Sequence, residues 1–232
     1  MDYWIIGLLL FNYVQAKNYN ELVFSNYEEV YLINEDFPDL LIKAFNNAGY
    51  QLSFEDHTIK NAIKNANSGL LDGVILTSLN DYSEKISDLI PIPVIISSED
   101  VFVFFTTDLD CPESFNDLSN YTMLHYTSAN WYQPVVDRYN SPNIKANNIL
   151  DLVNIIKYTN TIDYLLVNSG AFKYLSDLTG DRIKRCFDEP ITHIIFKPFL
   201  HKKHQNKLYD ITIELEKIMY EYRVMKTKDP KF

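Results

Sequence analysis

The 232-residue chain lacks several features that mark common functional classes. It has no glycine-rich phosphate loop, no G-x-S-x-G segment and no H-E-x-x-H segment, so the usual sequence signs of a nucleotide loop, a serine hydrolase elbow or a zinc protease are missing. Positive charge is also in the minority. The chain has 21 Lys and Arg residues and 31 Asp and Glu residues, which gives a net charge of -10. Since nucleic acid requires a basic surface, we expect no nucleic-acid partner.

Long hydrophobic runs are absent too. The apolar stretch over residues 4–14 is too short to span a bilayer, but it has the length of the hydrophobic region of a signal peptide. Residues 14–16 (VQA) fit a small-residue cleavage site. The missing Lys or Arg before this stretch is atypical, and a misplaced start or a first buried strand are the alternatives. We predict a signal peptide over residues 1–16 and export to the periplasm.

Helix and strand patterns alternate from residue 37 onwards. Apolar residues at helical spacing follow Asp36, which can cap a helix, and Gly49 ends that helix in the manner of a left-handed C-terminal glycine. Residues 50–54 then alternate between apolar and polar side chains, which is typical of a strand. The segment is therefore predicted to form a helix followed by a strand.

The same alternation is repeated directly afterwards. Thr58 can cap a second helix that ends at Gly69, and residues 73–76 form a short apolar run, as in a buried parallel strand. This order predicts crossover βαβ units, whose functional atoms usually lie at the carboxyl ends of the strands. One such end lies at Thr77 and Ser78.

These patterns belong to a longer series of blocks. In chain order the blocks are AGY, NSGLLDGVI, DL followed by YTMLHYTSAN, ILDLVNIIKYTNTIDYLLVNSGAFKYL, and THIIFKPFLHKKHQNKLYDITIELEKIM. The series resembles the bacterial extracellular solute-binding protein family 3, the type II periplasmic binding proteins best known for amino-acid uptake. No single block is diagnostic, but their order and spacing are specific and cover nearly everything after residue 22.

The resemblance implies an α/β, two-lobed type II periplasmic-binding-protein fold. Each lobe is then a mostly parallel sheet flanked by helices, and two crossover strands form the hinge. We expect residues 17–98 with 198–232 to form lobe 1, and residues 99–197 to form lobe 2 with the hinge crossovers. The cleft between the lobes is the expected ligand site. The protein is expected to be a monomer without a cofactor.

Ligand contacts are implied at the strand ends of both lobes. Thr127 and Ser128 follow a predicted strand and begin a helix, where free backbone N–H groups can hold an anion. A simple helix cap is the alternative there. Thr77 and Ser78 occupy the matching position in lobe 1.

Tyr27 and Trp131 are the expected apolar walls of the cleft, although both could equally be core rings.

Two residues with which the family binds the carboxylate and the amino group of an amino acid are missing. The segment TSLNDYSEK offers Lys85 where the family has an arginine that can bind a carboxylate with two parallel hydrogen bonds. Asn168 stands where the family has an acidic residue for the amino group. We therefore expect a polar small molecule that is not a standard α-amino acid, with Asn168 among its contacts.

The two cysteines fit export. The resemblance implies that residues 101–105 and 191–196 are antiparallel crossing strands. If Phe104 lies near Ile195, then Cys111 falls near Cys186, and the geometry allows a disulfide that suits an oxidising compartment. Two buried free thiols are the alternative.

The resemblance implies an exported small-solute-binding protein that works with a membrane permease. A ligand-sensing or regulatory module of the same fold is the alternative, and a dehydratase-like enzyme is the less favoured one. The five histidines form no evident constellation, and His201 with His204 has helical metal-ligand spacing but no evident third ligand. We therefore predict no catalytic residue and no metal ligand.

Overall fold

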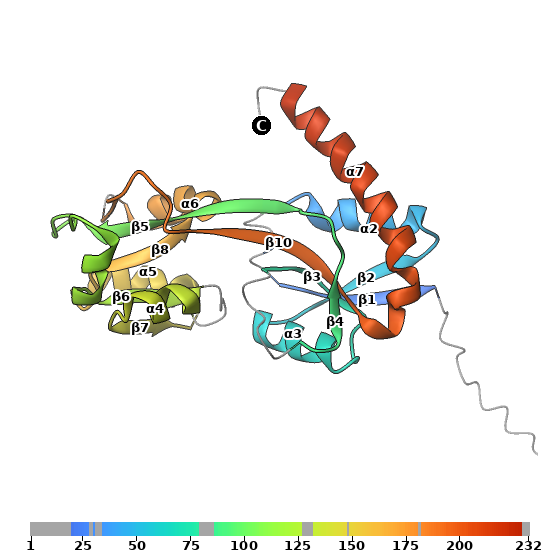
Figure 1. The fold of residues 1–232 in the computed structure, drawn as a ribbon, viewed down its shortest axis with the longest axis horizontal. Coiled ribbons are helices and arrows are strands. Elements are labelled where there is room, and N and C mark those ends of the chain that lie inside the picture. Colours follow the sequence, from blue (N-terminus) through green and yellow to red (C-terminus); the bar gives the residue numbers. More distant parts are fainter. Residues whose placement is uncertain are drawn as a thin grey trace, which may run out of the picture.

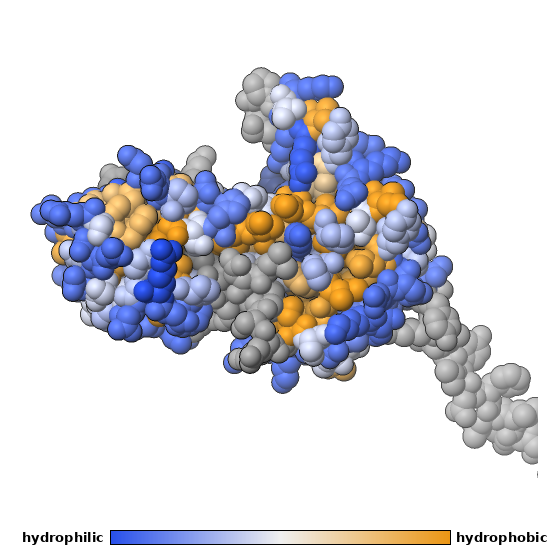
Figure 2. Space-filling view, viewed as in Figure 1, coloured by the Kyte–Doolittle hydropathy of each residue, from blue (hydrophilic) through white to orange (hydrophobic). Residues whose placement is uncertain are grey.

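The structure, a computed structural model, describes residues 20–27, 30, 34–78, 86–126, 132–147, 149–180 and 182–228. Within these ranges a mixed sheet with flanking helices forms two lobes that are joined by two long strands (Figure 1). Figure 2 shows the same view in space-filling form, with apolar residues exposed on the lobe that carries α7. The signal peptide predicted for residues 1–16 lies outside the described ranges.

The strands are β1 (Glu21–Asn26), β2 (Gln51–Asp56), β3 (Gly73–Ser78), β4 (Leu89–Pro91), β5 (Ser97–Thr106), β6 (Met123–Tyr126), β7 (Asn143–Ala146), β8 (Tyr164–Asn168), β9 (Ile183–Arg185) and β10 (Thr192–His201). The α-helices are α2 (Phe37–Asn47), α3 (Ile59–Asn67), α4 (Gln133–Tyr139), α5 (Ile149–Tyr158), α6 (Ser169–Thr179) and α7 (Leu208–Lys228), and the 3-10 helices are η2 (Phe115–Asn120) and η4 (Lys202–Lys207). The strand order is β2-β1-β3-β10-β5-β8-β6-β7, with β4 beside β10 and β9 beside β5.

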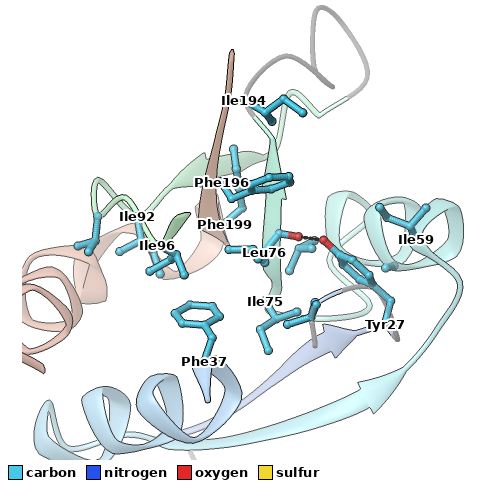
Figure 3. Close-up of a cluster of buried hydrophobic side chains, with 14 of the residues drawn as sticks. Tyr27, Phe37, Ile59, Ile75, Leu76, Ile92, Ile96, Ile194, Phe196 and Phe199 are labelled. Carbon is cyan, nitrogen blue, oxygen red and sulfur yellow. Dashed lines mark hydrogen bonds between the residues drawn. The ribbon is translucent and has the colours of Figure 1, made fainter. Parts of the chain in front are cut away.

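Lobe 1 is built on the parallel strands β2, β1 and β3, with α2, α3 and α7 around them (Figure 1). Close packing requires a glycine at the start of β3, since a Cβ at Gly73 would overlap the ring of Phe24 and the carbonyl of Phe199. Figure 3 shows the apolar core of this lobe, in which Phe37 from α2 and Ile75 from β3 gather with Phe199 from β10. The predicted alternation of helix and buried strand is confirmed here.

Glycines end helices as predicted, and Asp36 and Thr58 occupy the predicted N-cap positions, but neither side chain makes a cap hydrogen bond. Gly49 and Gly69 adopt φ angles of +86° and +77°, the left-handed conformation that a glycine accepts without strain. Asp36 is already helical and makes no cap hydrogen bond, because its carboxylate instead accepts a hydrogen bond of 2.8 Å from the Tyr222 hydroxyl of α7. Thr58 has the extended backbone of a cap residue, yet its side chain makes no cap bond.

Lobe 2 places β6 in parallel between β7 and β8, with α5 and α6 contributing to its apolar cluster. Phe172 of α6 stacks on Phe104 of β5 with ring centroids 4.5 Å apart. Cys111 and Cys186 form a disulfide with Cα atoms 5.3 Å apart, which ties the loop after β5 to the end of β9.

The hinge consists of β5 and β10, which run antiparallel as predicted. Their register differs from the assumed one: Ile195 pairs with Ser98 and not with Phe104, which pairs with Arg185 of β9. A register shift in β10 falls between Lys197 and Phe199, around a proline that has no N–H for the ladder. None of the helices in the described ranges is long and apolar enough to cross a membrane.

Candidate functional site

Three predicted ligand contacts lie together at the carboxyl ends of β1 and β3. Thr77 and Ser78 end β3, and both are buried. Tyr27 follows β1 directly, and its hydroxyl donates to the backbone carbonyl of Leu76 (Figure 3). The Tyr27 ring is buried among core side chains such as Ile59, so it forms part of the lobe 1 core. Contact of these residues with a ligand stays a prediction.

The other described contact, Asn168, ends β8 and precedes α6. It is partly buried and makes no side-chain cap bond. Glu99 of β5 caps α6 in its place, because one carboxylate oxygen accepts from Ser169 Oγ at 2.6 Å and from Gly170 N at 3.0 Å. Its other oxygen accepts from Ser97 Oγ at 2.6 Å. The positive end of the α6 dipole stabilises the negative charge of Glu99. These hydrogen bonds therefore link the hinge strand β5 to the start of α6.

The polar ends of the two lobes face the same short stretch of hinge. Ser78 pairs with Phe196 of β10, and Phe196 pairs with Ser97 of β5. Asn168 pairs with Val101, four residues further along β5. An extended strand covers about 13 Å in that distance. A small molecule lying against this stretch of hinge could therefore reach polar groups of both lobes.

Thr127, Ser128 and Trp131 lie outside the described residues, as does Lys85. Their roles in ligand binding stay predictions. Of the seven predicted contacts, the structure thus brings three together in lobe 1 and places Asn168 across the hinge from them.

A second polar group lies on the hinge itself. His193 of β10 pairs with Asp100 of β5, and Ser98 is two residues before Asp100 on the same face of that strand. The Nε2 atom of His193 lies 2.6 Å from Ser98 Oγ, and its Nδ1 atom lies 3.0 Å from Asp100 Oδ1. All three residues are exposed. The sequence pattern did not bring His193 together with Ser98 and Asp100.

A buried carboxylate holds the C-terminal segment to lobe 1. Asp72 is 2% exposed and accepts hydrogen bonds from Val23 N at 2.9 Å, Lys203 Nζ at 2.8 Å and His204 Nε2 at 2.6 Å. Burial raises the pKa of Asp72, but the hydrogen bonds from Lys203, His204 and Val23 outweigh it and hold the pKa below its ordinary value. This cluster gives His204 a structural role: it lies within η4, which His201 precedes as the N-cap residue, and its ring binds the Asp72 carboxylate. Within the described ranges no three His, Cys, Asp or Glu side chains are grouped to hold a metal ion.

A cavity of about 340 Å³ lies at the far end of lobe 2. Its lining includes Thr107, Asp108 and Arg182 together with the buried Ile156. It also includes the residues that directly precede β8, whereas Asn168 lies at the opposite end of that strand. The cavity is therefore separate from the predicted ligand contacts.

No protein-family model matches the chain, and no curated protein matches it. Solved structures do match. An arginine-bound mutant of ArgBP from T. maritima has a TM-score of 0.69 at 12% identity, covering 88% of this chain and 98% of that chain. A putative L-cystine ABC transporter from Listeria monocytogenes has a TM-score of 0.68 at 12% identity, covering 86% and 90% of the two chains.

A histidine kinase sensor domain with similarity to periplasmic binding proteins also matches, with a TM-score of 0.71 at 14% identity. The match covers 90% of this chain and 95% of that chain. Identities this low show the fold alone. The chain thus has the two-lobed α/β fold of the periplasmic binding proteins, which the sequence resemblance implied.

Proposed function

We propose that this chain is an exported, monomeric solute-binding protein that closes on a polar small molecule between its lobes. The proposal rests on one observation. Polar residues at the ends of strands from both lobes lie along the same stretch of the hinge. Thr77 and Ser78 come from β3, and Asn168 comes from β8. In open α/β sheets, ligands bind outside the carboxyl ends of strands, so this is the expected position of a ligand.

Closure follows from differential affinity. A ligand that touches both lobes only in the closed form binds that form more tightly and raises its population. The lobes in this proposal are residues 17–98 with 198–232, and residues 99–197. Thr127 and Ser128 would add polar contacts from lobe 2, and Trp131 would contribute aromatic surface, while Tyr27 would support the lobe 1 side of the site from within the core.

The ligand in this proposal is not a standard α-amino acid. Asn168 offers an amide where an ammonium group would prefer a carboxylate. Glu99 lies beside Asn168, but it already accepts three hydrogen bonds, and its negative charge disfavours a ligand carboxylate at this end of the hinge. A neutral ligand with several hydrogen-bond donors satisfies these groups best.

Transport is the favoured use of such binding, with a membrane permease as the partner. The match to a putative ABC transporter supports this choice at the level of fold. The match to a histidine kinase sensor domain, with a TM-score of 0.71, favours a ligand-sensing module as the second candidate. Co-purification of the chain with permease subunits from solubilised membranes would support transport over sensing.

Thermal-shift screening of the full chain tests the proposal, using amino acids beside polyols, amides and small sugars. A ligand at a hundredfold excess over its Kd stabilises by about 2.7 kcal/mol, which raises the Tm of a chain of this size by roughly 5–10 °C. We expect such a shift with a neutral polar compound. Asn168→Ala should abolish it, whereas Asn116→Ala on the exposed face of η2 should preserve it.

Two results would count against the proposal in different ways. A shift of this size with a common α-amino acid would contradict the ligand class. Native mass spectrometry that finds no bound small molecule, combined with a screen that gives no shift, would contradict binding itself.

A further inference from the structure

The register of the hinge strands assembles a serine, a histidine and a carboxylate on one exposed face. Residues two apart on a strand share a face, so Ser98 and Asp100 point the same way from β5. The antiparallel register places His193 of β10 directly opposite Asp100 and diagonal to Ser98. The His193 ring therefore lies within hydrogen-bond distance of both side chains, at 2.6 Å and 3.0 Å.

The carboxylate decides which nitrogen of His193 carries the proton. An ionised carboxylate only accepts hydrogen bonds, so the contact between Asp100 Oδ1 and His193 Nδ1 requires a proton on Nδ1. In the neutral ring Nε2 is then an acceptor, and the hydroxyl of Ser98 donates to it. This is the arrangement in which an imidazole can take the serine proton.

We propose that Ser98 is an activated nucleophile, with His193 as its general base and Asp100 as the residue that positions the ring. The distances match those of nucleophile and base pairs in covalent catalysis. The substrates we propose are small activated esters. Ser98, His193 and Asp100 lie on an exposed strand face, where a small reactive ester can approach without a shaped pocket. This activity is independent of the solute-binding proposal.

The chemical step balances without a further reactant. Ser98 Oγ attacks the ester carbonyl carbon while its proton passes to His193 Nε2, and the C–O bond to the leaving alcohol breaks as the alcohol takes that proton. Water then attacks the acyl-serine and gives its proton to His193. The carboxylic acid leaves and Ser98 recovers its proton.

Exposure sets the expected rate. The side chains of His193 and Asp100 are 49% and 50% exposed, so water competes for each hydrogen bond. General-base assistance gives about 10² to 10⁴-fold acceleration, and we expect the lower end of that range. The natural comparison is another exposed serine on the same chain, such as Ser119 of η2, which donates only to the backbone carbonyl of Asn116 among its described contacts.

The test treats the full chain with a fluorophosphonate probe and maps the adduct by tandem mass spectrometry. Attack by Ser98 Oγ forms a P–O bond, breaks the P–F bond and releases fluoride, while the proton passes to His193. We expect the adduct at Ser98, forming about 100-fold faster than at Ser119. His193→Gln should remove this advantage, and Ser119→Ala should leave labelling of Ser98 unchanged.

The role of Asp100 needs a kinetic readout. With p-nitrophenyl acetate, Asp100→Asn should lower the acylation rate about tenfold, and Asp100→Glu should recover part of it. The Tm of each variant reports whether it is folded. No adduct at Ser98, equal labelling of Ser98 and Ser119, or a rate that His193→Gln does not change would each overturn the proposal. The three side chains would then only link β5 to β10.

Discussion

Removing the carboxylate of Asp72 is the sharpest test of how lobe 1 holds its C-terminal segment. The side chain lies just before β3 and is almost fully buried. It accepts hydrogen bonds from the backbone of β1 at Val23 and from Lys203 and His204 of η4. Asp72→Ala leaves all three donors without this acceptor.

The cost can be estimated from burial. Breaking a buried charge pair from one side costs about 3–5 kcal/mol, and an unpaired buried backbone N–H costs about 1–3 kcal/mol. The side chains of Lys203 and His204 are 33% and 19% exposed, so water can partly replace Asp72. We therefore expect a loss of about 3 kcal/mol. Asp177→Ala on the exposed surface of α6 is the matched control, and it should change stability by less than about 0.5 kcal/mol.

The cluster also predicts the dependence of stability on pH. The pKa of Asp72 is lowered in the fold, so its contribution is present above the unfolded value of about 3.9 and is lost as the pH falls through the folded value. Burial lowers the pKa of His204 more than its bond to Asp72 raises it. The fold therefore favours neutral His204, and this contribution declines as the pH falls below about 6.5.

Urea denaturation at pH 7.5, 5.5 and 3.5 measures these effects, with the m value confirming that the unfolding reaction is unchanged. Asp72→Ala should lower the free energy of unfolding at pH 7.5 and should weaken the stability loss of the wild type between pH 5.5 and 3.5. A loss below about 1 kcal/mol at pH 7.5, or an unchanged acid-dependent loss, would refute the reasoning.

Three further changes have defined outcomes. Replacing Cys111 and Cys186 by serine opens a loop with a sequence separation of 75, which costs about 4 kcal/mol in the chain-entropy model, and an unchanged Tm would contradict this. Asn168→Asp brings a second carboxylate within about 7 Å of Glu99, since both side chains flank Gly170. The repulsion should lower the free energy of unfolding by about 0.6–2.4 kcal/mol, and 1 M salt should restore it. Tyr222→Phe removes the hydroxyl that donates to Asp36 at 2.8 Å and lies 3.2 Å from the Asn34 side-chain oxygen. It should lower the free energy of unfolding by about 1 kcal/mol in urea denaturation, and no change would contradict this contribution.

The parts of the fold that follow from local sequence were predictable. Helix α3 is an example, because a cap residue and a terminal glycine limit its extent: it was predicted between Thr58 and Gly69, and it spans Ile59–Asn67. Caps were less predictable, since a polar side chain at a helix start has competing partners. Asp36 could bind its own helix start or Tyr222 of α7, and only the packing of α7 against α2 shows that it binds Tyr222.

The register of the hinge could not be predicted, because it joins strands that are distant in sequence and no short turn fixes their alignment. The assumed pairing of Phe104 with Ile195 is six residues away from the observed pairing of Ser98 with Ile195. It would have placed His193 beside Thr106, away from Ser98. The contacts among Ser98, Asp100 and His193 were therefore not predicted, because they depend on the register and not on the residue types.

The candidate ligand site was predictable where it depends on strand ends. Thr77, Ser78 and Asn168 follow from the rule that functional groups lie at the carboxyl ends of parallel strands. Glu99 does not follow from that rule. It reaches the start of α6 only because Val101 pairs with the last residue of β8, which again depends on register.

Small-angle X-ray scattering of the full chain, with and without a compound that raises its Tm, tests the central claim most directly. Closure of two lobes about the hinge predicts a smaller radius of gyration at saturating compound, and a variant that cannot bind should show no change. A bound compound that leaves the radius of gyration unaltered would contradict an account in which the lobes close on their ligand.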